Sequence, residues 1–220
     1  MLLQNFVGGG VEHAQAVFRR GEFLAMHAYG QVARGAGGGD AIKESLDRPD
    51  LRAGLARIGA HLVWHGALSV DIIRPADGIA RYIDCNPRLV EPMSAALAGI
   101  DLAGLLLAVS HDAPVAPPPE GRAGLRSHLA IQALIGCAIA GASRRALLAE
   151  CARLLLRRGA YAESREELTP ARLDWLSSLP VAATAAMLLA RPAAAARLPR
   201  RFGAHLLTAE SLRRIAEMDG

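Results

Sequence analysis

Two aspartates, Asp71 and Asp84, lie on either side of a turn signal in the stretch 68–88. Runs rich in Val, Ile and Tyr flank Asp77-Gly78, and Asp-Gly between such runs is the strongest local signal for a β-hairpin with a two-residue type I′ turn. If these two residues form the turn, Asp71 faces Asp84 directly across the two strands. Like charges in that arrangement are destabilising unless a cation neutralises them.

Alternation along the two strands assigns their side chains to two faces. The polar face is predicted to hold four side chains: Ser69, Asp71, Asp84 and Asn86. The opposite face is expected to join the core: Leu68, Val70, Ile72, Ile83 and Cys85. Carboxylates and an amide carbonyl are hard oxygen ligands that suit Mg²⁺ or Mn²⁺. The hairpin therefore predicts a metal–phosphate site.

The hairpin pattern leaves two questions open. The two-residue turn also pairs Ala76 with Ile79 and Ile73 with Tyr82, whereas a loop of three or four residues centred on 76–78 would offset the two acids. The same residues are also compatible with a solvent-exposed face on which the two aspartates are unconnected.

The composition describes a globular chain and argues against nucleic acid as a partner. The 220 residues are 52% hydrophobic, which is enough for a core. The net charge is +4, but Lys43 is the only lysine and the arginines are scattered. With 4% aromatic residues, stacking on bases is poorly supported.

The cysteines and the apolar runs predict a cytoplasmic protein without a membrane span. Cys85, Cys137 and Cys151 are odd in number and far apart, which indicates neither a disulfide framework nor a CxxC metal site. The N-terminus lacks the basic region of a signal peptide. The longest uncharged runs, 129–143 and 175–190, are shorter than the roughly 20 residues that a transmembrane helix needs.

Before the hairpin, the pattern predicts an antiparallel meander and one helix. Strands are expected at 14–18 and 23–29, and an amphipathic helix at 49–64. Between them, the Gly-rich stretch 35–45 is predicted to be a loop that carries Lys43. Such a loop can bring backbone N–H groups to an anion, although it is more often a mobile connection.

After the hairpin, the chain is predicted to become helical. Helices are expected at 91–98 and 102–109, the second with Asp101 as its N-cap. Five further helices are predicted: 125–140, 144–157, 169–179, 181–197 and 208–218. The predicted organisation is therefore a first unit at 1–112, a Pro-rich linker at 113–123 and a helical domain at 124–220. The fold class is α+β: an antiparallel sheet with helices, followed by an all-α region.

The order of these elements, with SVDI at 69–72 and YIDCNPR at 82–88, resembles the C-terminal half of an ATP-grasp domain. The resemblance is nearest to the biotin carboxylase and carbamoyl-phosphate synthetase group and covers Leu2 to Val109. In that family the penultimate strand carries an acid, and the last strand reads acid, any residue, Asn, Pro or Thr, Arg. The matching positions here are Asp71, Asp84, Asn86 and Arg88.

The resemblance implies a role for each matching residue. Asp71, Asp84 and Asn86 would hold the Mg²⁺ or Mn²⁺ ions that bridge the ATP phosphates, and Arg88 would stabilise the acyl phosphate or the transferring phosphoryl group. The family's adenine hinge corresponds to four residues near the N-terminus: Gln4, Asn5, Phe6 and Val7. Glu12 is the expected ribose contact, and Lys43 is expected to face phosphate or substrate.

The activity implied by the resemblance is that of an ATP-dependent ligase. ATP would convert a small carboxylate, or bicarbonate, into an acyl phosphate that an amine or another nucleophile attacks. The family's phosphate-binding lysine and second glycine-rich lid precede the hinge, where this chain starts. We therefore expect an N-terminally truncated enzyme that needs a complementary N-terminal ATP-grasp half, or a homo-oligomer. The alternative is a catalytically incomplete relative that acts as a non-enzymatic interaction or regulatory module through its helical C-terminal region.

Overall fold

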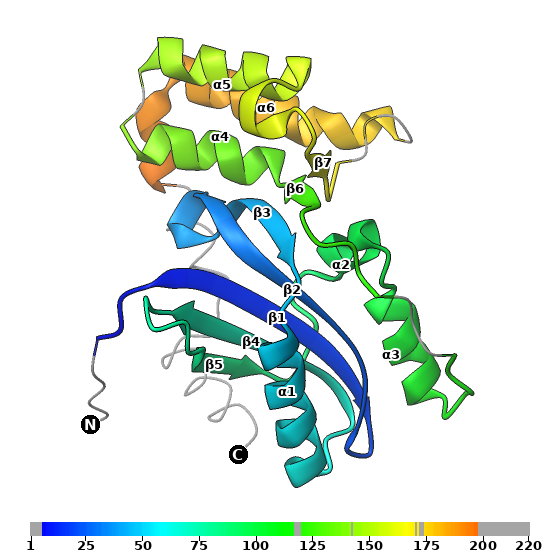
Figure 1. Cartoon of the computed structure of the whole chain (residues 1–220). Helices are drawn as coiled ribbons and strands as arrows, with labels where there is room; N and C mark the ends of the chain where they lie inside the picture. The colour runs from blue at the N-terminus through cyan, green and yellow to red at the C-terminus, as the bar shows by residue number, and fades with distance from the viewer. Residues whose placement is uncertain (1–5, 117–119, 142, 170, 172–173, 198–220) are drawn as a thin grey trace, which may run out of the picture.

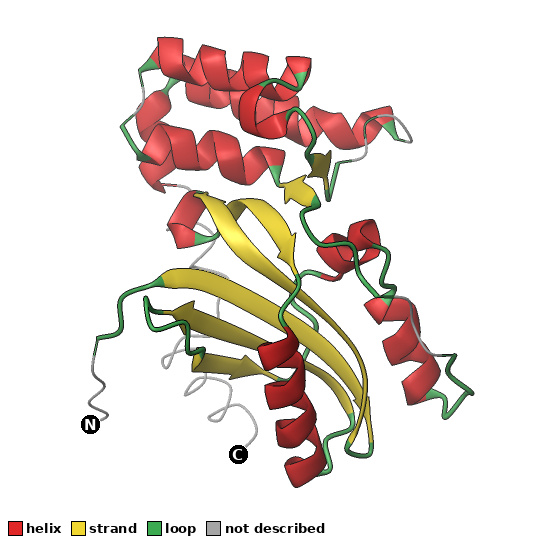
Figure 2. Ribbon diagram, viewed as in Figure 1, coloured by secondary structure: helices red, strands yellow, loops and turns green. Residues whose placement is uncertain are grey.

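The computed structural model describes residues 6–116, 120–141, 143–169, 171 and 174–197. Figure 1 shows a curved sheet with helix α1 lying across it and a separate group of helices beyond one edge of the sheet. Figure 2 shows the same division by colour, with the yellow strands gathered below the red helices of the C-terminal region. The fold is α+β, as the sequence predicts.

Seven strands form one sheet in the order β5-β4-β1-β2-β3-β6-β7. All neighbours are antiparallel except β6 and β7. The strands are β1 (Gly10–Arg19), β2 (Glu22–Arg34), β3 (Asp40–Leu46), β4 (Gly66–Arg74), β5 (Arg81–Asn86), β6 (Arg126–His128) and β7 (Arg165–Glu166).

The α-helices are α1 (Pro49–Leu62), α2 (Pro92–Ala98), α3 (Leu102–Ser110), α4 (Ala130–Ile139), α5 (Arg144–Leu156) and α6 (Leu179–Ala190). Short 3₁₀ turns are η1 (Ala36–Gly38), η2 (Gly159–Tyr161), η3 (Trp175–Ser178) and η4 (Pro192–Arg197). Among the described residues no single helix is long and apolar enough to cross a bilayer, although α2 and α3, bent by 114°, reach that length and composition together.

The sheet is covered by different elements on its two faces. On one face α1 contributes Leu51 and Leu55, which pack with side chains of β1, β2 and β4: Ala14, Ala16, Phe18, Met26, Ala28, Leu68, Val70 and Ile72. Burying a leucine of this kind stabilises the fold by roughly 1.5–3 kcal/mol. On the other face α2 and α3 pack near Val17 and Ala25. That face also carries a row of polar side chains.

The hairpin register is confirmed at the two acids, but its turn differs from the prediction. Asp71 pairs with Asp84 and Ser69 with Asn86. The connection runs through 75–80 and contains a turn in which the Gly78 N–H donates to the Pro75 carbonyl at 3.0 Å. Because only Gly78 of the Asp77-Gly78 pair has a positive φ, the predicted type I′ turn is wrong.

An irregularity in the ladder restores the predicted pairing of the acids. The register shifts between Asp71 and Ile72, so that Tyr82 pairs with Ile72 and not with Ile73 as predicted. The longer loop shifts the pairing by one residue, and the β-bulge shifts it back, so that Asp71 still pairs with Asp84. A two-residue connection with positive φ at both positions, as type I′ requires, does occur between β1 and β2, at Arg20 (47°) and Gly21 (91°).

The predicted core face of β5 is wrong. Ile83 is 53% exposed and Cys85 is also exposed. The physical reason is that β5 is the outermost strand and the core around α1 ends at the β4 residues Leu68, Val70 and Ile72.

The Gly-rich stretch is a strand over most of its length. Only Gly35 to Gly39 form a turn, and β3 begins at Asp40 and pairs with β2 through Gln31 and Lys43. The charged residues of DAIKESL hide the strand from pattern analysis. Strand β2, with 13 residues, is long enough to supply a partner for it.

The C-terminal region is helical in large part, but not entirely. The predicted helix at 125–140 begins only at Ala130, because residues 126–128 form β6 and add to the sheet next to β3. The predicted helix at 169–179 is wrong as well, since the structure has a 3₁₀ turn at 175–178 there. The predicted helix at 208–218 lies outside the described residues. The division into units at 1–112, 113–123 and 124–220 stays a prediction.

Candidate active site on the polar face of the sheet

A row of polar side chains crosses five strands on the face of the sheet opposite α1. Direct cross-strand partners in this row are Asp84, Asp71, His13, Tyr29 and Ser45, on β5, β4, β1, β2 and β3 in turn. Because directly opposite residues in a sheet place their side chains on the same face, all five project to one side. We call this surface, together with the flanking Gln31 and Lys43, the polar face.

At one end of the polar face His13 lies between two carboxylates. Its Nδ1 is 2.8 Å from Asp71 Oδ1, and its Nε2 is 3.4 Å from Asp40 Oδ2. Burial acts to lower the pKa of His13, but the hydrogen bond to Asp71 and the charges of Asp40 and Asp71 outweigh it and raise that pKa. Burial also raises the pKa of Asp40.

The acid at the edge of the sheet is held by its own strand. Asp84 Oδ1 accepts a hydrogen bond from the Cys85 N–H at 2.9 Å, and Oδ2 accepts one from Asn86 Nδ2 at 3.0 Å. Ser69 Oγ donates to the carbonyl of Arg88 at 2.7 Å, which anchors the backbone beside the acids. The Arg88 side chain itself is exposed.

The donor set at this end fits a hard divalent cation. Asp71 and Asp84 face each other across two strands, and the amide of Asn86 lies next to Asp84. In the described part of the chain no group of three His, Cys, Asp or Glu side chains could hold a metal ion. A site here therefore depends on the amide oxygen of Asn86 as a third protein ligand, with water or phosphate oxygens completing the shell.

At the other end of the polar face Lys43 is fully buried between two carboxylates. Its Nζ contacts Glu91, at the start of α2, and lies 3.0 Å from Glu167, which follows β7. The ammonium also lies 5.4 Å from the centre of the Tyr29 ring. Burial raises the pKa of Glu167 against the opposing effect of Lys43.

Burial keeps two neighbours of Lys43, His27 and Tyr29, in their neutral forms. Burial lowers the pKa of His27 to about 4, and the charge of Lys43 adds to that shift. The His27 ring is neutral as a result, with Nε2 2.9 Å from Ser45 Oγ. Burial, followed by the charge of Glu91 and a hydrogen bond to it, raises the pKa of Tyr29.

Lys43 is not on a loop, which corrects the sequence prediction. It lies in the middle of β3, and its ammonium is already paired with carboxylates. The sequence does not mark Glu91 and Glu167 as partners of Lys43. Glu91 resembled a helix start, and Glu167 stood in a region without any motif. The one available signal was that the only lysine of the chain follows the apolar pair Ala41-Ile42.

Glu12 is separated from the predicted metal ligands by the thickness of the sheet. It pairs with Ile72, whereas its neighbour His13 pairs with Asp71, so Glu12 and Asp71 project to opposite faces. The Glu12 carboxylate is buried and held by Arg48 at 2.6 Å and Arg74 at 2.9 Å. Its predicted contact with a ribose stays a prediction.

The predicted adenine hinge is only partly described. Gln4 and Asn5 lie outside the described residues. Phe6 is 96% exposed and Val7 is half-buried. Their contact with a base stays a prediction.

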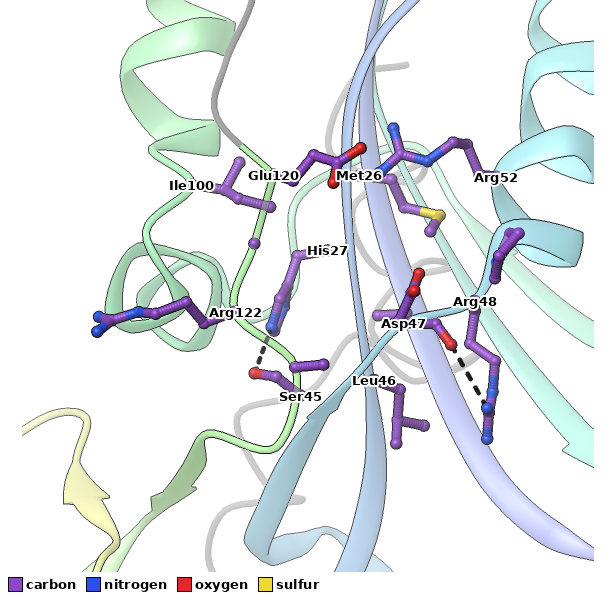
Figure 3. Close-up of a pocket in the computed structure, with 14 residues that line it drawn as sticks. Met26, His27, Ser45, Leu46, Asp47, Arg48, Arg52, Ile100, Glu120 and Arg122 are labelled. Carbon is purple, nitrogen blue, oxygen red and sulfur yellow. Dashed lines mark hydrogen bonds between the residues drawn. The ribbon is translucent and has the colours of Figure 1, made fainter.

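Three pockets lie at different places around the sheet. One of 470 Å³ adjoins the buried lysine and is lined by Glu91 and Glu167 among others. A second of 450 Å³ lies between α1 and the β4–β5 connection. A third of 380 Å³ is shown in Figure 3, where His27 and Ser45 lie on one side and Arg48 and Arg52 on the other. Neither the second nor the third is lined by any residue of the predicted site.

Several solved structures are similar to part of this chain. A pyruvate carboxylase from Rhizobium etli is 17% identical, with a TM-score of 0.44 over 53% of this chain and 13% of that chain. The ATPase subunit of phosphoribosylaminoimidazole carboxylase from Aquifex aeolicus is 15% identical, with a TM-score of 0.43 over 53% and 38% of the two chains. A biotin carboxylase from Campylobacter jejuni is 15% identical, with a TM-score of 0.42 over 56% and 30%.

These similarities concern the fold, and the chain spans less than two fifths of the length of each of the three matched chains. The matches include biotin carboxylases, the group that the sequence motif resembles. No protein-family model matches the sequence, and no curated protein matches it.

Proposed function

We propose that this chain forms the metal-holding part of an ATP-dependent ligase of the ATP-grasp type. In the proposed reaction the γ-phosphoryl group of ATP passes to an oxygen of a small carboxylate or of bicarbonate. ADP leaves, and an amine or another nucleophile then displaces phosphate from the acyl phosphate.

One observation carries the proposal: the register places Asp71 opposite Asp84, with Asn86 two residues and Arg88 four residues after Asp84. Two carboxylates in that position repel each other, and the only base that contacts either of them in the described structure is His13, which lies on the far side of Asp71 from Asp84. A divalent cation would remove the repulsion. The strand spacing and the acid–x–Asn–Pro–Arg order support the same function independently.

The residues of the polar face divide the proposed work among them. Asp71, Asp84 and Asn86 would hold Mg²⁺ or Mn²⁺, which when bound neutralises the phosphate oxygens of ATP. His13 orients Asp71 through its 2.8 Å contact. Arg88 would place a positive charge next to the transferring phosphoryl group, since its backbone is fixed by Ser69 while its guanidinium remains in solvent.

Metal binding is the first test of the proposal. The full chain is titrated with Mn²⁺, and the free ion is followed by electron paramagnetic resonance. We expect a class of sites whose affinity falls at least about tenfold in Asp84→Asn. The matched control is Asp112→Asn, because Asp112 is an exposed acid that pairs with Arg20 away from the polar face. Equal Mn²⁺ affinity in the native chain and Asp84→Asn would contradict the assignment.

Nucleotide binding is the second half of the test. The fluorescence of a mant-labelled ATP is measured with the chain in the presence and absence of Mg²⁺. A signal that requires Mg²⁺ and disappears in Asp84→Asn supports the proposal. A signal that is independent of Mg²⁺, or that survives the substitution, counts against it.

A second candidate function is an interaction module that works through the helical region. The observation in its favour is a set of large apolar side chains that are exposed on α5, η3 and α6: Leu148, Leu155, Leu156, Trp175, Leu176 and Leu179. Sedimentation velocity tests whether a second copy of the chain covers them. A dimer that is lost in Leu155→Glu would favour this function, and a monomer at every concentration would count against self-association.

A further inference from the structure

The 470 Å³ pocket beside Lys43 has an apolar body and an acidic end. It lies between α2 and the residues around β6 and β7, which Figure 1 shows close to one another at the edge of the sheet. Its apolar lining includes Val90, Met93, Leu129 and Leu168. The charged side chains that line it are all acids: Glu91, Asp101 and Glu167.

The charges at the acidic end are not balanced. One ammonium, that of Lys43, serves both Glu91 and Glu167. Within the described residues no other base lies within 4.0 Å of either carboxylate. Buried charges are stable only when paired, so this cluster has room for one more positive charge.

One oxygen of the Glu167 carboxylate, Oε1, is buried without a hydrogen bond. Its side chain is 2% exposed, and it lines the pocket. Its Oε1 lies 3.0 Å from Lys43 Nζ but receives no hydrogen bond. The aligned hydrogen bond from Lys43 goes to the other oxygen, Oε2, at 3.1 Å, so Oε1 has acceptor capacity left in a buried place. A donor that enters through the pocket would satisfy it.

We propose that this pocket binds a primary ammonium group attached to a small aliphatic body. The ammonium would donate to Glu167 and Glu91, and the aliphatic part would lie against Val90, Met93 and Leu129. A carboxylate would be repelled by the same acids, and a neutral alcohol would leave the charge imbalance in place. The helical region thus supplies, through Glu167, one wall of a ligand site on the sheet.

The inference rests on the proposed function in one respect, because it makes the pocket the site of the nucleophile. Val90 and Glu91 are two and three residues after Arg88 in the chain, and Glu91 contacts Lys43 on the polar face. An amine held by Glu91 and Glu167 would therefore lie on the same face of the sheet as the proposed phosphoryl site and beside the segment that carries Arg88. The substrate class that follows is an aliphatic primary amine.

The test uses three probes of equal shape and different charge. 3-Methylbutylamine, 3-methylbutan-1-ol and 3-methylbutanoate are titrated into the full chain at pH 7, and binding is followed by ligand-observed NMR. We expect the amine to bind at least about tenfold more tightly than the alcohol, and the carboxylate not to bind. Equal affinity for the amine and the alcohol would overturn the proposal.

Two variants locate the site. Glu167→Gln should weaken amine binding at least about tenfold, while the matched control Glu163→Gln, at an exposed position two residues before β7, should leave it unchanged. Met93→Trp should block the pocket from the solvent side and abolish binding without touching the charge cluster. Amine binding that is unaffected by both Glu167→Gln and Met93→Trp would overturn the proposal.

The same samples separate this inference from the proposed function. Asp84→Asn should weaken Mn²⁺ binding at least about tenfold and leave amine binding intact. If Mn²⁺ binds as expected but the amine does not, the inference fails and the proposed function stands. If the amine binds as expected and Mn²⁺ binds equally to Asp84→Asn, the pocket stands as an amine site and the metal assignment fails.

Discussion

The two ends of the polar face solve opposite electrostatic problems. At the β4–β5 end Asp71 and Asp84 bring two negative charges together near solvent, and at the β3 end Lys43 brings a positive charge into the interior. The pKa of His13, which lies beside the acids, is raised. The pKa of His27, which lies near Lys43, is lowered by burial and by the charge of Lys43. The same sheet thus shifts the pKa values of two histidines in opposite directions a few strands apart.

The comparison shows why the charges at one end remain open to a cation while the ammonium at the other end is paired within the fold. Charges near solvent need no fixed partner, because water screens them, and they remain available to a cation. A buried ammonium needs its partners in the folded chain. Glu91 and Glu167, which are 48 and 124 residues away from Lys43, meet that need.

The largest expected effect is the loss of the buried lysine. Lys43→Met leaves the Glu91 and Glu167 carboxylates without a cation, and removal of one partner of a buried ion pair costs about 3–5 kcal/mol. Urea unfolding measures the change in the free energy of unfolding. The matched control is Arg126→Met on β6, whose partner Glu44 is partly exposed, and there we expect a loss of less than about 1 kcal/mol.

A double substitution sharpens that prediction. If unpaired carboxylates cause the loss, Lys43→Met combined with Glu167→Gln should be more stable than Lys43→Met alone. Additive losses in the double variant would show that Lys43 acts through packing and not through charge.

The next effect is a loss of stability in acid that depends on His27. Its pKa is about 4 in the folded chain against 6.5 in the unfolded chain, so the unfolded state takes up the proton first as the pH falls. The His27 contribution is therefore fully present above pH 6.5 and is lost between 6.5 and 4. Linkage converts the shift to about 3 kcal/mol.

Comparison with His27→Gln isolates this contribution, because the other titrating groups are common to both proteins. Urea unfolding at pH 7 and pH 4 should show that the native chain loses more stability than the variant. Parallel pH profiles for the two proteins would contradict a neutral, buried His27.

The smallest effect on stability is expected at the β4–β5 end of the polar face. Asp84→Asn removes the repulsion with Asp71 and keeps an oxygen that can accept from the Cys85 N–H, so the free energy of unfolding should change by less than about 0.5 kcal/mol. Asp71→Asn, which disturbs the contact with His13, should be the more damaging of the two. A large loss in Asp84→Asn alone, measured by urea unfolding, would mean that the acid pair is structural.

The hairpin with its two acids was predictable because its information is local. Val70, Ile72 and their alternation with polar residues indicate the strand, and the core side of β4 determines which face is polar. The turn was not predicted correctly, because an Asp-Gly pair favours a type I′ turn only when the loop has two residues. Asp71 pairs with Asp84 as predicted because the six-residue connection is compensated by the bulge after Asp71.

The strand β3 and the ligand pocket could not be predicted from local pattern. DAIKESL has three charged residues, and it is a strand because β2 on one side and β6 on the other complete its hydrogen bonds. Lys43 is tolerated there because residues far away in the chain neutralise it.

By itself the sequence determined that Asp71, Asp84, Asn86 and Arg88 fall within one hairpin and the turn that follows it. Only the tertiary structure decided where the charge of Lys43 goes and that Glu167 of the helical region meets it. The physical reason is range: alternation along a strand acts over a few residues, whereas the pairing of buried charges depends on whichever segments the fold brings together.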